Sequence, residues 1–175
     1  MGIYVSLQAV SPEILEKMVQ RPELCMEALA PAELETFELG LEERPEDWCS
    51  LDKAWHAVSY LFTGTDWGAG PPLGYIVEGG VELEWDDSDF EVPPRALSPD
   101  QVKGWNEAVQ GIDDATLRAR FDPDRMTELQ ISPGFWNRDP DRAALLDWVM
   151  KQVGPFRLFL QETVRRGYAL LVVTS

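Results

Sequence analysis

Apolar and polar positions are distributed differently at the two ends of the chain. Near the start, Ile3, Val5 and Leu7 alternate with mostly polar neighbours, and this period of two predicts a strand over residues 1–10 with one buried face. Near the end, the stretch YALLVVT at 168–174 is apolar without a break, which is typical of a strand buried on both faces. We expect these two strands to be neighbours in one sheet.

Between the two strands, helical spacing and cap residues predict a series of helices. Ser11 followed by Pro12 is the pattern of a capped helix start, Asp139 is a similar cap, and Gly154-Pro155 should separate the last two helices. The expected helices are, in chain order, residues 11–20, 23–30, 32–39, 51–62, 99–110, 114–120, 139–153 and 155–166.

Two stretches carry mixed signals. Residues 75–85 fit either a hairpin that turns at Gly79-Gly80 or a short helix followed by a loop. Residues 91–97 should be extended, and their two prolines favour an edge strand or a loop. Together the pattern predicts an α+β fold. We expect a single compact domain over residues 1–175, with one small mixed sheet that includes the N- and C-terminal strands and packs against several helices.

The predicted helix over residues 51–62 contains the single histidine of the chain. A helix turns by about 100° per residue, so apolar positions three or four apart form one stripe that should face the core. The stripe comprises Leu51, Trp55, Val58 and Phe62. Asp52, His56 and Ser59 fall within about 60° of arc on one shoulder of the stripe, so their side chains are expected to meet.

This Asp-His-Ser arrangement has two interpretations. In the catalytic one, Asp52 orients His56, which acts as a general base toward Ser59 or a substrate. In the structural one, Asp52 favours the positive end of the helix dipole, His56 lies one turn further on, and Ser59 bonds back to a carbonyl. The chain has no G-x-S-x-G turn to expose a nucleophilic serine, and we favour the structural interpretation.

The net charge of −16 narrows the classes of partner. A nucleic-acid surface requires clustered Lys and Arg, and an anionic membrane repels an acidic protein, so neither partner is expected. The acidic residues concentrate at 31–48 and 77–91. They form either a solvated face or a surface that takes up a basic protein.

The sequence contains no familiar pattern for a metal site or a cofactor site. Cys25 and Cys49 are far apart, which is typical of reduced thiols in a cytoplasmic protein, and one histidine with two cysteines gives no familiar zinc site. The acidic run WDDSDFE at 85–91 lacks the glycine and final glutamate of a calcium loop. The stretch GAGPPLG at 68–74 lacks the spacing of a phosphate loop. We therefore expect no metal and no cofactor.

Several of the seven tryptophans lie in or beside predicted loops. Trp67 and Trp85 flank the glycine-proline loop and the acidic run. Exposed aromatic rings next to carboxylates bind sugars, cations or basic peptides, whereas buried ones only seal loops onto the core. The candidate binding residues are Trp67, Trp85, Asp86, Asp87 and Asp89.

Several motifs together resemble a known family. They are MGIYVSLQAV-S at the start, LDKAWHAVSYLFTG at 51–64, EVPPRALSPDQVKGW at 91–105, ISPGFW at 131–136 and LFLQETVRRGYALLVVTS at 158–175. In this order they are similar to the DUF1877 family of bacterial proteins, and the resemblance extends over nearly the whole chain. It implies one compact α+β domain, and it supplies no catalytic residues because the family name denotes an unknown function.

The preferred functional hypothesis is a non-catalytic, soluble binding protein of the immunity or inhibitor type, with an acidic surface for a basic partner. The alternative is a small hydrolase or ligand-binding enzyme that uses Asp52 and His56 in a cleft beside residues 66–74. A third hypothesis is a structural domain without a cleft. A fully packed His56 would count against the enzyme.

Overall fold

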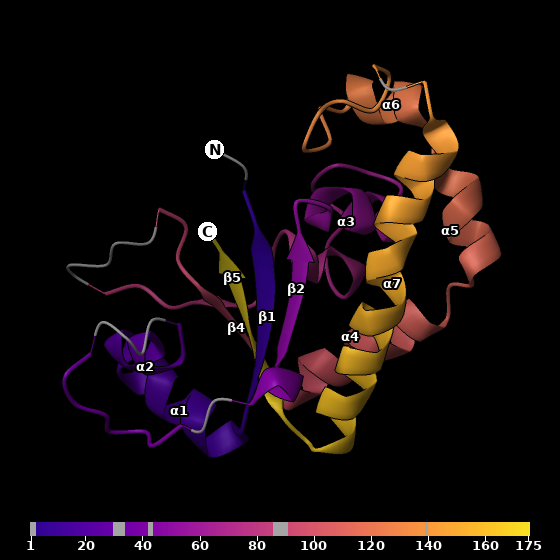
Figure 1. Ribbon diagram of the computed structural model, residues 1–175. Helices are drawn as coiled ribbons and strands as arrows, with labels where there is room; N and C mark the ends of the chain where they lie inside the picture. The colour runs from indigo at the N-terminus through magenta and orange to yellow at the C-terminus, as the bar shows by residue number, and fades with distance from the viewer. Residues whose placement is uncertain (1–2, 30–33, 42–43, 86–90, 139) are drawn as a thin grey trace.

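A computed structural model gives the structure of the chain, and it describes residues 3–29, 34–41, 44–85, 91–138 and 140–175 (Figure 1). A five-stranded sheet lies between two groups of helices. Its strands are β1 (Val5–Val10), β2 (Trp48–Asp52), β3 (Val81–Glu82), β4 (Arg95–Leu97) and β5 (Ala169–Thr174). Their order across the sheet is β2-β1-β5-β4-β3.

The two terminal strands form the centre of this sheet. β1 and β5 run antiparallel, with Val5 opposite Thr174 and Val10 opposite Ala169, so the expectation that they are neighbours is confirmed. Every pairing among the described strands is antiparallel, and the sheet is therefore not the mixed one that we expected. The hydrophobic pattern could not reveal this, because it fixes which residues are buried but not the direction of a strand. The α+β fold class is confirmed.

The described helices are α1 (Pro12–Gln20), α2 (Cys25–Leu29), α3 (Trp55–Thr63), α4 (Pro99–Gln110), α5 (Asp114–Arg120), α6 (Pro123–Glu128) and α7 (Arg142–Arg165). Short 3-10 turns are η1 (Pro22–Leu24), η3 (Pro45–Asp47) and η4 (Leu73–Ile76). The side chains of Ser11, Ser98 and Asp113 cap α1, α4 and α5 by accepting backbone N–H groups three residues later. These three helix starts are where the sequence predicted them.

Helices cover both faces of the sheet (Figure 1). α1 and α2 pack on one face, around a small cluster that includes Met18, Leu171 and Val173. α3, α4 and α7 pack on the other face, where Leu170 and Val172 join a larger cluster. Successive residues of a strand point to opposite faces, so the double cover explains the unbroken apolar run of β5.

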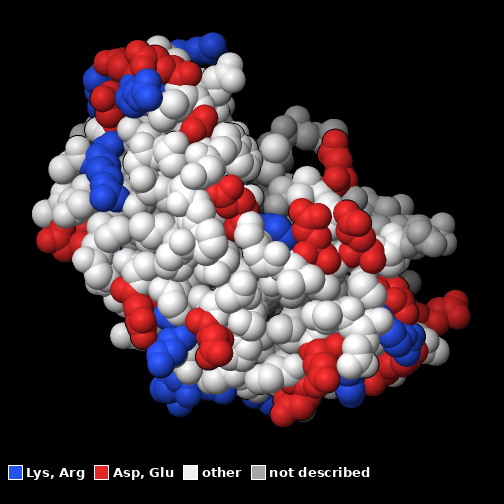
Figure 2. Space-filling view, turned by 180° about the vertical axis from the view of Figure 1, so that it is seen from behind, with Lys and Arg blue, Asp and Glu red and all other residues white. Residues whose placement is uncertain are grey.

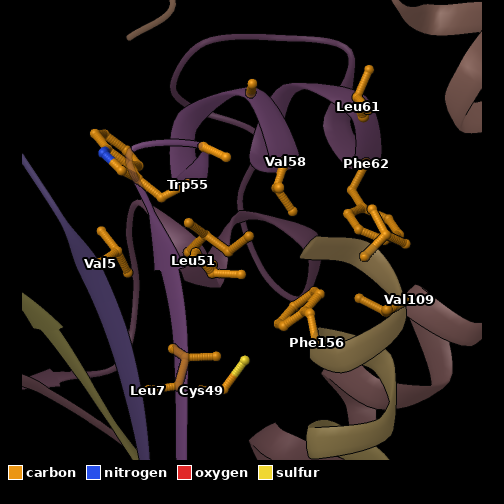
Figure 3. Close-up of a cluster of buried hydrophobic side chains, with 14 of the residues drawn as sticks. Val5, Leu7, Cys49, Leu51, Trp55, Val58, Leu61, Phe62, Val109 and Phe156 are labelled. Carbon is orange, nitrogen blue, oxygen red and sulfur yellow. The ribbon is translucent and has the colours of Figure 1, made fainter. Parts of the chain in front are cut away.

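The larger cluster gathers side chains from strands and helices (Figure 3). Leu51 of β2 lies beneath Val58 of α3, and Phe62 meets Phe156 of α7 edge to face at 5.9 Å between ring centroids. This cluster is what anchors α3 against the sheet.

α7 corrects the prediction of two helices separated by Gly154-Pro155, because the helix continues through both residues. Pro155 costs one backbone hydrogen bond, roughly 3 kcal/mol in an exposed helix. Val153 and Phe156 on either side are buried in the larger cluster, and their packing offsets that cost. Asp141 caps α7, whereas the predicted cap Asp139 lies outside the described residues.

Three further stretches differ from the prediction. The described part of 32–39, residues 34–39, contains no helix. Residues 75–85 begin with the end of the short helical turn η4 and do not form a hairpin at Gly79-Gly80. The strand that follows, β3, pairs with β4 instead. β4 lies inside the sheet between β5 and β3 instead of at an edge. Within the described segments, no helix is both long and apolar enough to cross a membrane.

Candidate functional site

The helix that contains the histidine starts later than the sequence predicts. Residues 48–52 are strand β2, and α3 begins at Trp55. Cys49 and Leu51 are buried while Ser50 and Asp52 are exposed, so this stretch follows the period of a strand. Leu51 fits the core-facing stripe of a helix equally well, which is why the helical interpretation was wrong here.

Asp52 is therefore not on the helix with His56. It ends β2 with a left-handed φ of 48°, its backbone N–H bonds to Ser50 Oγ, and its side chain is exposed. The described residue whose charge acts on the His56 ring is Asp66, in the loop that follows α3. The predicted Asp52–His56 pair does not form in this structure.

His56 is buried, and both of its ring nitrogens face backbone groups. Nδ1 accepts a hydrogen bond from the backbone N–H of Ser132 at 3.0 Å, so it carries no proton. The proton then lies on Nε2, which donates to the carbonyl oxygen of Asp66 at 3.3 Å. Burial lowers the pKa of His56, while the Asp66 carbonyl and the Asp66 charge partly oppose that shift. The neutral imidazole joins α3 to two separate loops.

Ser59 makes no hydrogen bond with this histidine in the structure. Its side chain is fully buried, and its hydroxyl makes no hydrogen bond with the described residues. A general base needs a ring nitrogen with a free lone pair, but Nδ1 of His56 already accepts the Ser132 N–H. Of the three predicted catalytic candidates, Asp52 is exposed on β2, whereas His56 and Ser59 are both buried on α3 and no hydrogen bond joins them.

A ring stack connects His56 to the surface. The His56 ring lies parallel to Trp55, 4.7 Å between centroids and 7° between planes, and Trp67 contacts the His56 ring at 5.2 Å. Trp55 is itself fixed, because its indole N–H donates to the carbonyl oxygen of Ile3 at 3.0 Å. Trp67 is the outermost ring and remains 54% exposed. The stack therefore holds a large aromatic side chain in place at the surface.

Asp66 adds a negative charge beside this exposed ring. A hydrogen bond from the backbone N–H of Trp67 is the main cause that lowers the pKa of Asp66, and the hydroxyl of Thr65 also bonds to its Oδ1 at 3.1 Å. The carboxylate is therefore ionised at neutral pH. Trp67 was among the predicted binding residues, whereas Asp66 was not, because the only signal for Asp66 in the sequence is its position next to the tryptophan.

The other predicted binding residues lie elsewhere or are not described. Trp85 is half-buried against the smaller cluster, on the α1–α2 face of the sheet, whereas the ring stack belongs to the other face. The two tryptophans therefore do not form one site. Asp86, Asp87 and Asp89 lie outside the described residues.

The glycine-proline loop binds a carboxylate of the chain itself. The backbone N–H of Gly70 donates to Glu78 Oε1 at 2.8 Å, and a Cβ added at Gly74 would lie 2.9 Å from the same oxygen. Nearby, the buried guanidinium of Arg95 donates to the carbonyls of Tyr75, Ile76 and Gly79. The loop is thus organised by internal bonds, and among the described residues no group of three His, Cys, Asp or Glu side chains is arranged to hold a metal ion.

The fold and this arrangement define a single α+β domain with a preorganised aromatic and acidic loop, and comparison with known proteins gives its family. The family model DUF1877, a domain of unknown function, matches residues 1–173, so the chain belongs to the DUF1877 family. The chain is also similar to YfbM of Escherichia coli, a protein of unknown function with a crystal structure. The two share 18% identity at a TM-score of 0.70, over 98% of this chain and 99% of that one, which is a likeness of fold. No curated protein matches the chain.

Proposed function

We propose that the protein is a non-catalytic binding protein and that the loop of Asp66 and Trp67 anchors a basic protein partner. The observation that carries the proposal is Trp67, an exposed indole held by the His56 and Trp55 rings. Tryptophan is among the residues most enriched at the energetic centres of interfaces. A ring that is already fixed loses little conformational entropy when a partner binds, which favours affinity.

The indole ring of Trp67 and the neighbouring carboxylate of Asp66 favour a positively charged group on the partner. A lysine or arginine side chain attracts the face of an indole ring, and the Asp66 carboxylate is close enough along the chain to pair with the same cation. The net charge of −16 attracts basic proteins at long range. Figure 2 shows acidic side chains distributed over one face of the molecule, with fewer basic ones among them.

The proposal is tested by identifying a partner and then weakening its anchor. The purified protein is immobilised and exposed to a lysate of the source organism, and the proteins that elute with salt are identified, purified and titrated by calorimetry. We expect a basic partner whose affinity falls as salt rises. Trp67→Ala should weaken its binding about 30-fold or more, the effect of losing an interface hot spot of about 2 kcal/mol. Asp66→Asn should reduce the salt dependence.

Phe37→Ala is the matched control, because Phe37 is an aromatic residue of similar exposure, 56%, in a loop on the α1–α2 side. Its binding should equal that of the unmodified protein. The proposal is wrong if no protein is retained better by the unmodified chain than by Trp67→Ala. It is equally wrong if Phe37→Ala weakens the purified partner as much as Trp67→Ala does.

A further inference from the structure

A groove of about 400 Å³ lies between the C-terminal half of α7 and the segment from Arg44 to Trp48. The end of α7 lies beside the start of β2 in the fold (Figure 1). Its apolar lining consists of Trp48, Pro155, Leu158 and Phe159. Leu158 is 60% exposed, the highest value among the large apolar side chains of the described residues, and Trp48 is 37% exposed. Two exposed apolar side chains, distant in sequence, therefore meet in one concave site.

The charged residues of the groove differ from those of the chain as a whole. Arg44, Arg165 and Arg166 line it together with Glu46 and Glu162, so arginines outnumber acids there by three to two. Over the whole chain, by contrast, 31 acidic residues exceed 15 basic ones. The groove thus places arginine side chains next to apolar ones in a protein that is acidic as a whole.

Two of these arginines have different roles. Arg166 donates to Asp47 at 2.6 Å, and its guanidinium lies 4.4 Å over the Tyr168 ring, so it fixes the end of α7 to η3. Arg165 donates to Glu162 through Nε alone, and its two terminal nitrogens bond to none of the described residues. Both side chains of the Arg165–Glu162 pair are exposed, and such a pair contributes little to stability. Arg165 can therefore turn its planar edge to an incoming anion.

We propose that this groove binds a small amphipathic carboxylate. The apolar body lies against Trp48 and Leu158, and the carboxylate pairs with the terminal nitrogens of Arg165. A groove of this volume is near the lower end of the roughly 300–1,000 Å³ found for small-molecule sites, so it suits a compact ligand better than a folded partner. This site is on α7 and β2, remote in sequence from the Trp67 loop, and the proposal does not depend on the function proposed above.

The test uses octanoate as the probe. Binding is followed by the shift of the Trp48 indole N–H signal in two-dimensional NMR spectra, with the signal identified by its loss in Trp48→Phe. We expect octanoate to bind in the millimolar range or more tightly, and acetate, which lacks the apolar body, to cause no shift. Octanol has the same body without the carboxylate, and it should bind about tenfold more weakly.

Variants separate the charge from the apolar surface. Arg165→Gln should weaken octanoate about tenfold and leave octanol unchanged, whereas Leu158→Asp should abolish the binding of both. Arg118→Gln is the matched control, since Arg118 is another exposed arginine in one ion pair, with Asp147. The proposal fails if octanoate binds no better than octanol, if Arg118→Gln weakens it as much as Arg165→Gln, or if the Trp48 signal does not move.

Discussion

His56 should make the stability of the protein depend on pH near neutrality. The ordinary pKa of the imidazole is 6.5, and burial lowers it in the folded protein. The unfolded chain therefore binds a proton at a pH where the folded chain does not. Stability is fully present above the unfolded pKa of 6.5 and is lost as pH falls below it. The hydrogen bond at Nδ1 acts in the same direction as burial, because a proton added to Nδ1 would point at the backbone N–H of Ser132.

The size of the effect follows from the linkage relation. If the folded ring stays neutral throughout, the free energy of unfolding falls by about 1.4 kcal/mol between pH 7.5 and pH 5.5, which is the upper limit for one group with an unfolded pKa of 6.5. The chain has one histidine, and most carboxylates titrate below this window, so the change can be assigned to His56. The experiment is urea unfolding, followed by tryptophan fluorescence, at three pH values across the window.

Two variants decide whether the reasoning is correct. His56→Gln removes the titration, so its free energy of unfolding should be about 1–3 kcal/mol lower at pH 7.5 but nearly constant across the window. Asp52→Asn should keep the pH dependence of the unmodified protein, because Asp52 is exposed on β2 and does not pair with the ring. A His56→Gln variant that kept the full dependence would refute the argument. If Asp52→Asn changed the pH dependence of the free energy of unfolding, the result would support the Asp52–His56 pair that the sequence predicted.

The remaining predictions concern two glycines and the two buried thiols. Gly80→Ala should lower the free energy of unfolding by about 1–3 kcal/mol in the same urea assay, because Gly80 has a φ of +87° and a Cβ there would lie 2.7 Å from the Ala96 carbonyl oxygen. Gly104→Ala, in the interior of α4 with open space around it, should instead raise it by about 0.5–1 kcal/mol, and equal effects of the two would contradict this account. Burial raises the pKa of Cys25 to about 12 and that of Cys49 to about 11, so neither thiol should react with a disulfide reagent at pH 8 until urea unfolds the chain. Rapid labelling of the folded protein would show that a thiol is accessible.

The sequence predicted the parts of the fold whose signals are local. Ser11, Ser98 and Asp113 each satisfy an N–H three residues away, so a short stretch of sequence contains the whole interaction. β2 was missed because Leu51 suits both a strand and a helix, and pairing with β1 decided between them. The predicted helix break at Pro155 was wrong, because packing around Phe156 outweighed the local tendency of proline to end a helix.

The candidate site was harder to predict for a related reason. His56 binds backbone atoms of Asp66 and Ser132, and a backbone carbonyl or N–H has no characteristic residue type. The groove beside α7 combines Trp48 with Leu158, which no spacing rule connects. The sequence left open whether Trp67 is exposed or seals a loop, and its exposure and the rings that hold it in place became visible only in three dimensions.

The pairing of β1 with β5 has a consequence for biosynthesis. β1 at Val5–Val10 leaves the ribosome long before its central partner, β5 at Ala169–Thr174, has been made. At roughly 5–20 residues per second, β1 waits for about ten seconds or more before the middle of the sheet can close. Until then one edge of β1 has no partner strand, because β2 pairs with the other edge. A nascent chain stalled before β5 should therefore be a target for chaperones. A circular permutant that links Ser175 to Tyr4, which exchange backbone hydrogen bonds, would produce the β5–β1 hairpin first.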